Sequence, residues 1–348
     1  MKFSLRGIII FSMILLSFFG ILTIMSSQSE AASPYYLTVR QLFSFAAAVG
    51  IMFACSAVPF SFFRKNALPL AVISLIAVFI LPLLGTRING MCGWFRYGSF
   101  SLQPTEIAKA FFLLGLVGIL NMFKKESQKF FIGLGYTALW LVSILIQPDF
   151  GTAFIYLAVF ILLVFAAGIS WKWLIGSALL AGATAVIFIQ THPYAQKRLT
   201  AFLNPSSSWH MQQLELASAR GGWLGSKIGQ ALWSNAYVPL PYNDSAFATL
   251  TETIGFAGAF LVLVLFAVLL SALSLTALRR DLSENARLFA AGSAIIIGVQ
   301  ALLHIGVNLS LLPPTGLTLP LISYGGSSLA GCGILLGVTL SAAAEKKE

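Results

Sequence analysis

Residues 247–278 read FATLTETIGFAGAFLVLVLFAVLLSALSLTAL, an apolar stretch with one acid and no Lys or Arg. About 20 apolar residues are enough for a helix to cross a bilayer, so this stretch predicts a membrane-spanning helix. The whole chain has the same character, because 58% of its 348 residues are hydrophobic and only 9% are charged. Soluble domains carry about 25% charged residues, which excludes that class. Ten such stretches are predicted, at 7–26, 38–60, 68–85, 106–123, 130–147, 150–169, 173–190, 247–278, 286–311 and 316–342.

The basic residues predict the orientation, because Lys and Arg accumulate in short cytoplasmic loops. With both termini on the cytoplasmic side, most of the 21 Lys and Arg fall there. The net charge of +10 is therefore interpreted as topology and not as nucleic-acid binding. The first stretch also has features of a cleaved signal peptide. Its apolar run, 7–25, is longer than the roughly 7–15 residues of such a signal, which favours a retained span.

These features predict one all-α integral membrane domain, 1–348, of about ten helices. Its long connection is an outer loop, 191–246, between the seventh and eighth helices. Within it, 209–230 predicts an amphipathic helix broken at Gly221 and Gly222, with Trp209, Trp223 and Trp233 as interfacial anchors. A helix resting on lipid and a binding surface both fit this pattern.

Acids are few, so the candidates for proton transfer can be enumerated. Glu106 lies three residues before Lys109 at the start of the fourth span, which places both on one helical face. A structural ion pair is expected there because an unpaired charge is costly in a membrane, and contact with substrate is the alternative. Asp149 stands between two spans and is expected to cap the second of them.

Asp244 and Glu252 mark the outer boundary of the eighth span. Asp244 follows a Pro-rich turn, 239–243, and Glu252 lies about two helical turns further along. A helix that begins near Asp244 would place both carboxylates near one face, and an N-cap role for Asp244 is the alternative. The segment 222–227 lacks the spacing of a phosphate-binding loop. The histidines at 192, 210 and 304 lack metal-ligand spacing and are interpreted as structural.

Four motifs occur together in this chain. They are 89–94 followed by QPTEIAK at 103–109, QPDFGTA at 147–153, glycines at 221, 222, 225 and 229, and PPTGLTLPLISYGGSS at 313–328. With the ten predicted spans and the long outer loop, the chain resembles the SEDS family of bacterial cell-wall polymerases, the group containing FtsW, RodA and SpoVE, over nearly its whole length. The run at 315–320 favours an FtsW-like member. The small residues at 323–328 are expected to interrupt the tenth span, for close helix packing or to line a polar cavity.

The resemblance implies an enzyme that polymerises lipid II into glycan strands at the outer face of the bacterial cytoplasmic membrane, in division or elongation. It places the family's essential outer-loop aspartate on Asp244, and its next acid on Glu252. The attacking sugar hydroxyl needs a carboxylate within hydrogen-bond reach, so Asp244 is the expected catalytic base. The leaving undecaprenyl pyrophosphate needs positive charge or a divalent cation. The expected substrate-binding residues are Arg96, Gln103, Lys197, Arg198, Gln213, Arg220, Lys227 and Glu252.

The resemblance also implies partners, namely a class B penicillin-binding transpeptidase and other division or elongation proteins. Some positions depart from the family's pattern. Gly93 stands where Arg usually precedes Trp94, and Leu240 and Thr253 stand where acids are usual. Two other functions fit the same residues. A lipid flippase or transporter would also carry buried acids beside broken helices, and a non-enzymatic scaffold of the division machinery would need no reaction at all.

Overall fold

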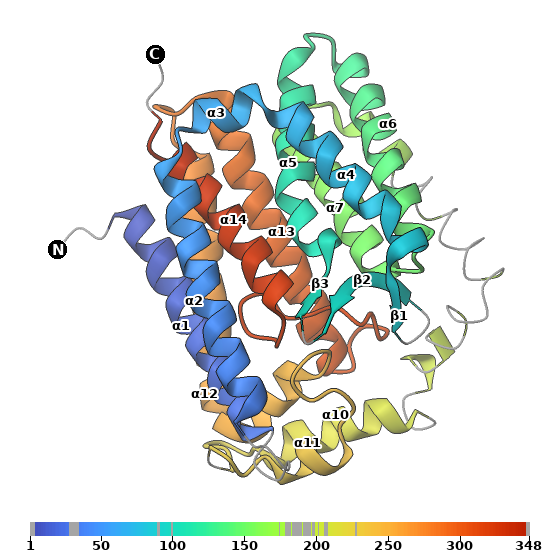
Figure 1. The fold of residues 1–348 in the computed structure, drawn as a ribbon, viewed down its shortest axis with the longest axis vertical. Coiled ribbons are helices and arrows are strands. Elements are labelled where there is room, and N and C mark those ends of the chain that lie inside the picture. Colours follow the sequence, from blue (N-terminus) through green and yellow to red (C-terminus); the bar gives the residue numbers. More distant parts are fainter. Residues whose placement is uncertain are drawn as a thin grey trace.

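The computed structural model describes residues 4–27, 35–88, 91–98, 100–173, 175–177, 182, 190, 196, 199–200, 202–204, 208–226 and 228–345. It is a bundle of helices with a small sheet, with the C-terminus at one end and α10 and α11 at the other (Figure 1). The longer helices are α1 (Leu5–Ser26), α2 (Tyr36–Ala57), α4 (Ala67–Leu84), α5 (Pro104–Met122), α6 (Glu126–Leu145), α7 (Phe150–Ala166), α12 (Ala246–Ala277), α13 (Glu284–Asn308) and α14 (Gly326–Ala342). The shorter ones are α3 (Phe60–Lys65), α10 (Trp209–Arg220) and α11 (Leu232–Tyr237).

Among the described residues, 7 helices are long and apolar enough to cross a membrane, namely α1, α2, α4, α5, α6, α12 and α13. The apolar helices α7 and α14 are shorter, with 17 residues each. Together these helices match every predicted stretch except the seventh, 173–190, most of which lies outside the described residues. The chain is therefore a multi-pass membrane protein, and the count of ten spans stays a prediction.

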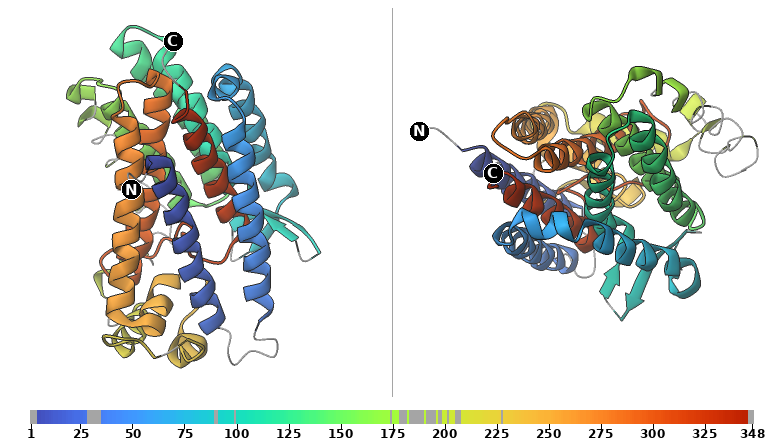
Figure 2. Two further views of the ribbon diagram at one scale, coloured as in Figure 1. Left: turned by 90° about the vertical axis from the view of Figure 1, so that its left-hand side faces the viewer. Right: turned by 90° about the horizontal axis from the view of Figure 1, so that it is seen from above.

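Helix α5 lies at the centre of the bundle. Its apolar window is 72% buried, against 22% for α2 and for α4, and it contacts α4, α6, α13 and α14. The views in Figure 2 show these neighbours on different sides of it. The close packing of α14 depends on Gly331, because a Cβ atom there would lie 2.5 Å from the carbonyl oxygen of Glu106. The polar side chains at the start of α5 are thus enclosed by protein and not by lipid.

The tenth predicted span, 316–342, is wrong in its first part, because α14 begins only at Gly326. Residues 313–319 have no regular structure, and turns follow up to the start of α14. The prolines at 313, 314 and 320 explain this, since each lacks a backbone N–H and restricts φ. We call residues 313–325 the crossing segment. The interruption expected at 323–328 is confirmed only as far as Gly325, because 326–328 belong to α14. Its extension back to residue 313 was not predicted.

The sequence analysis also did not predict a three-stranded antiparallel sheet between α4 and α5. Its strands are β1 (Thr86–Ile88), β2 (Met91–Tyr97) and β3 (Phe100–Leu102), in the order β1-β2-β3. It brings the chain from the end of α4 to Gln103, the residue that precedes α5. Arg96 pairs with Ser101 across β2 and β3 and is exposed.

The first part of α12, up to Gly255, is joined to the turn that follows α10. Helix α10 ends at Arg220, where the predicted break lies. The predicted helix over 209–230 is wrong beyond this point, because the described residues of 221–230 form turns and not helix. The turn then packs on α12, where Phe256 N donates to Gly222 O at 2.8 Å. This is possible because Gly255 breaks α12 with φ 69° and ψ −177°. A Cβ atom on Gly221 would lie 2.0 Å from the carbonyl oxygen of Thr251, so only glycine fits at this approach.

Candidate active site

Asp244 lines a pocket at the end of the bundle opposite the C-terminus, where α10, the start of α12, the end of α13 and the crossing segment meet (Figure 1). The pocket has a volume of about 280 Å³. Its other lining residues are His210, His304, Val307 and 314–317. Among the described residues, Asp244 is the one acid in this lining, and its side chain is half-buried.

Asp244 belongs to the turn before α12 and not to the helix itself. Helix α12 begins at Ala246 and its N-cap residue is Ser245, so the alternative in which Asp244 is the N-cap is wrong. The expectation that Asp244 and Glu252 share a helical face is also wrong, because Asp244 precedes the helix. The carboxylate of Asp244 is therefore placed by the turn.

Backbone carbonyls of this turn accept hydrogen bonds from other parts of the chain. Tyr324 N donates to Tyr242 O at 2.8 Å. Ser323 Oγ donates to Asn243 O at 2.8 Å. The amide of Asn308, at the end of α13, donates to Asp244 O at 3.0 Å. Three successive carbonyls are thus held from the crossing segment and α13.

Glu252 is engaged by α11. Its two carboxylate oxygens accept from Trp233 N at 3.0 Å, from Ser234 N at 2.8 Å and from Ser234 Oγ at 2.5 Å. Its exposed fraction is 2%. A buried carboxylate is costly unless it is well hydrogen-bonded, and these bonds meet that need. The contacts favour an anchoring role for Glu252 over direct contact with a substrate.

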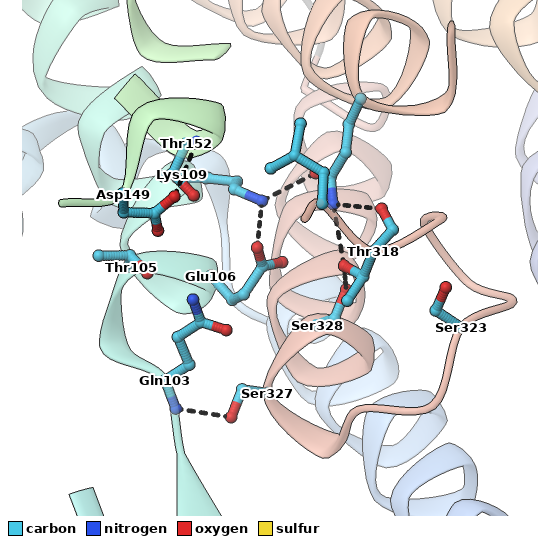
Figure 3. Close-up of polar contacts among 12 residues, drawn as sticks. Gln103, Thr105, Glu106, Lys109, Asp149, Thr152, Thr318, Ser323, Ser327 and Ser328 are labelled. Carbon is cyan, nitrogen blue, oxygen red and sulfur yellow. Dashed lines mark hydrogen bonds and ion pairs between the residues drawn. The ribbon is translucent and has the colours of Figure 1, made fainter. Parts of the chain in front are cut away.

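The ion pair between Glu106 and Lys109 is present, with Lys109 Nζ 2.6 Å from Glu106 Oε1. Lys109 Nζ also donates to Gln300 Oε1 on α13 at 2.8 Å. The amide nitrogen of Gln300 then donates to Thr318 O at 2.9 Å. Figure 3 shows the nitrogen of Lys109 joined by one dashed line to Glu106 and by another to a side chain that is itself joined to Thr318. The ion pair is therefore connected to the crossing segment through the side chain of Gln300.

Two histidines that the sequence analysis set aside as structural line the Asp244 pocket. His304 is 1% exposed, and its Nδ1 lies 2.7 Å from Leu317 O. A carbonyl oxygen only accepts, so Nδ1 carries a proton and donates it to this bond. Nε2 has no hydrogen-bond partner among the described residues. His210 comes from α10 and is half-buried. No spacing signal links positions 210, 244 and 304, since the fold alone brings them together.

Several predicted substrate-binding residues lie away from this lining. Arg220 is exposed and stacks on Trp233, with its guanidinium carbon 4.9 Å from the ring centroid. Gln213 is 6% exposed on α10, and its Oε1 has no partner among the described residues. Gln103 binds α14 through its backbone, where its N donates to Ser327 Oγ at 2.8 Å. Arg96 is on the sheet. Lys197, Arg198 and Lys227 lie outside the described residues.

Of the predicted interfacial anchors, Trp209 and Trp223 are exposed, with 56% and 74% of their surface accessible. Trp233 instead is half-buried and packs against a small cluster that includes Leu214 and Val238. Its contact with Arg220 further fixes it. Trp233 therefore supports the fold of the outer loop, and its role as an interfacial anchor stays a prediction.

Arg40 is a basic residue that the sequence analysis did not propose. It lies on α2, and the structure brings that part of α2 near Tyr324. Burial raises the pKa of the Tyr324 phenol above its ordinary value, and the guanidinium of Arg40 acts in the opposite direction. Tyr324 in turn packs against Tyr242, with ring centroids 5.8 Å apart. Positive charge is thus available close to the Asp244 turn.

Asp149 caps α7 as expected, because its Oδ1 accepts from Thr152 N at 3.1 Å. Its other oxygen, Oδ2, has no hydrogen-bond partner among the residues that the structure describes. Asp149 and Thr152 lie beside Lys109 in Figure 3. The QPD motif therefore has a local structural role at the start of α7.

Comparisons with known proteins agree with these features. The chain is 34% identical to the probable peptidoglycan glycosyltransferase FtsW of Alkalilimnicola ehrlichii over 336 residues, which cover 92% of this chain and 83% of that protein. Its structure resembles a chain of a peptidoglycan synthase complex described as coordinating polymerization and crosslinking, with a TM-score of 0.83, 28% identity and 96% of both chains covered. It also resembles the rod shape determining protein RodA of Thermus thermophilus, with a TM-score of 0.72, 26% identity and coverage of 96% and 95%. The model of the FtsW, RodA and SpoVE family, described as cell cycle proteins, matches residues 6–348, and this chain belongs to that family.

Proposed function

We propose that this chain is a peptidoglycan glycosyltransferase of the FtsW type, which polymerises lipid II into glycan strands at the outer face of the cytoplasmic membrane. The observation that carries the proposal is that the half-buried Asp244 lines a pocket at the end of the bundle where α10 lies, which the predicted orientation places on the outer side. The chain's membership of the family and the name of its relative support the same activity.

In the proposed reaction, a sugar hydroxyl of one substrate attacks the anomeric carbon of another. The new glycosidic bond forms as the bond to undecaprenyl pyrophosphate breaks, and Asp244 accepts the hydroxyl proton. General-base catalysis of this kind contributes about 10²- to 10⁴-fold in rate. The energy comes from the pyrophosphate ester of the substrate, which accords with the absence of a phosphate-binding loop at 222–227.

The leaving pyrophosphate carries negative charge that must be offset. Arg40 and Arg220 are the described candidates on the outer side, together with Arg96 on the sheet, and Lys197, Arg198 and Lys227 remain candidates from the sequence. Among the described residues, no group of three His, Cys, Asp or Glu converges on a common metal position. No step of this proposal passes through a metal.

The test is polymerisation of purified lipid II by the purified full-length chain, with products separated by size. We expect Asp244→Asn to lose at least about 100-fold in rate, because it removes the proton acceptor and keeps the side-chain shape. Glu215→Gln is the matched control, since Glu215 is exposed on α10. An active Asp244→Asn variant would refute the role of Asp244. Transfer of labelled lipid II across vesicles without longer products would support a flippase instead.

We also propose that both termini are cytoplasmic and that a class B penicillin-binding transpeptidase is the partner. The similar synthase complex couples polymerization with crosslinking, which supports a crosslinking partner for this chain. The expected result is that a cognate transpeptidase co-purifies with the chain and raises the polymerisation rate. A transpeptidase that neither binds nor changes the rate would contradict this part of the proposal.

A further inference from the structure

The crossing segment ends in Ser323-Tyr324-Gly325, whose role the proposed reaction leaves open. Ser323 is 2% exposed, and both hydrogen-bonding functions of its hydroxyl are used. The oxygen accepts from Leu319 N at 2.8 Å, and the hydroxyl donates to Asn243 O at 2.8 Å. A hydroxyl held from both sides cannot rotate freely, so it fixes the position of the Asn243 carbonyl.

Asn308 acts on the next carbonyl in the same way. It is 1% exposed, its Nδ2 donates to Asp244 O, and its Oδ1 accepts from Ala248 N at 3.0 Å. The side chain of Asn308 therefore joins the turn at 242–244 to the first helical turn of α12. Its Nδ2 also donates to His304 O at 2.9 Å, so the amide has little freedom to move.

Backbone contacts complete the arrangement. Tyr324 N donates to Tyr242 O, and its ring packs on the ring of Tyr242. Within the turn, Ser245 Oγ donates to Pro239 O at 2.8 Å. The carbonyl oxygens of residues 242, 243 and 244 thus accept hydrogen bonds from Tyr324, Ser323 and Asn308. Asp244 itself lines the pocket.

We propose that Ser323 and Asn308 are positioning residues, which fix the backbone of 242–244 and thereby aim the Asp244 carboxylate into its pocket. The expected effect on catalysis rests on the proposed function, whereas the expected effect on the backbone of 242–244 does not. A misplacement of about 1 Å in a reacting group costs about 100-fold in rate. When one of the three carbonyls loses its hydrogen bond, the other two still hold the turn, so we expect a smaller loss of rate.

The experiment compares Ser323→Ala and Asn308→Ala with Ser341→Ala in the purified full-length chain. Ser341 is the matched control because its hydroxyl is equally buried, at 3%, and donates to Val58 O at the other end of α14. Amide hydrogen exchange of residues 242–249 is measured by mass spectrometry, beside kcat and KM for lipid II polymerisation. The exchange measurement needs no activity.

We expect each positioning variant to accelerate exchange in 242–249 by at least about fivefold, which corresponds to the loss of one hydrogen bond. Each should lower kcat by about tenfold with KM within about twofold, because the pocket walls remain. Ser341→Ala should change neither quantity. Unchanged exchange in both variants, or an equal effect of Ser341→Ala on exchange and kcat, would overturn the proposal. If the unmodified chain makes no polymer, the proposed function fails while the exchange comparison still decides the positioning role.

Discussion

The contacts of Glu252 lead to a prediction about the outer loop. Glu252→Ala removes the acceptor of three hydrogen bonds from Trp233 and Ser234. Hydrogen bonds to a charged group contribute about 1.5–3 kcal/mol each. The three contributions do not add in full, because water can reach some of these donors once the carboxylate is removed. Leu232 is exposed and Trp233 is half-buried, so α11 lies close to the solvent. We therefore expect the local stability of α11 to fall by about 2–4 kcal/mol, somewhat more than one bond.

The assay is amide hydrogen exchange at single-residue resolution on the purified chain in lipid nanodiscs. A loss of about 2–4 kcal/mol corresponds to roughly 30- to 900-fold faster exchange at Trp233 and Ser234. Glu252→Gln keeps one acceptor oxygen but no charge, so its effect should be smaller. Glu215→Ala serves as the control, because it removes an exposed carboxylate from the neighbouring helix α10.

Exchange at Trp233 and Ser234 that stays within about twofold of the unmodified chain would refute this reasoning. It would mean that other contacts of α11, such as the stacking of Arg220 on Trp233, hold the helix without the carboxylate. An equal acceleration in the Glu215→Ala control would also refute it, because the effect would then be one of net charge.

Two further variants test local roles by thermal unfolding in detergent. Asp149→Ala should cost about 0.5–2 kcal/mol because it removes the cap of Thr152 N, while Asp149→Asn keeps an acceptor and should cost less; equal losses would contradict the capping role. His304→Leu should cost about 1–3 kcal/mol, because the carbonyl of Leu317 loses its donor in a buried site. His304→Asn can place an amide where Nδ1 lies and should cost clearly less, and a more harmful Asn variant would contradict this assignment.

The helices were predictable because the bilayer imposes a length and an apolar composition on each span. The Glu106–Lys109 pair and the cap at Asp149 were predictable for a similar reason, since both depend on residues only three apart. Such contacts follow from helical geometry alone. They need no knowledge of which helices are neighbours.

The pocket around Asp244 was only partly predictable. The sequence marked Asp244, but His304 reaches the pocket only because the crossing segment folds back over α13 and offers it the Leu317 carbonyl. Glu252 likewise turns to α11, whose position depends on the break at Gly255 and on backbone contacts with 221–226. These contacts join residues far apart in the sequence. No local pattern encodes them.

The buried ion pair and the Asp244 turn belong to one hydrogen-bonded path. Lys109 donates to Gln300, and Gln300 donates to the carbonyl of Thr318. The same peptide group carries the N–H of Leu319, which donates to Ser323, and Ser323 donates to the carbonyl of Asn243. Hydrogen bonds in such a chain polarise one another in a low-dielectric interior. A buried charge pair near the start of α5 is thereby connected to the backbone beside Asp244, which gives this costly lysine a structural role.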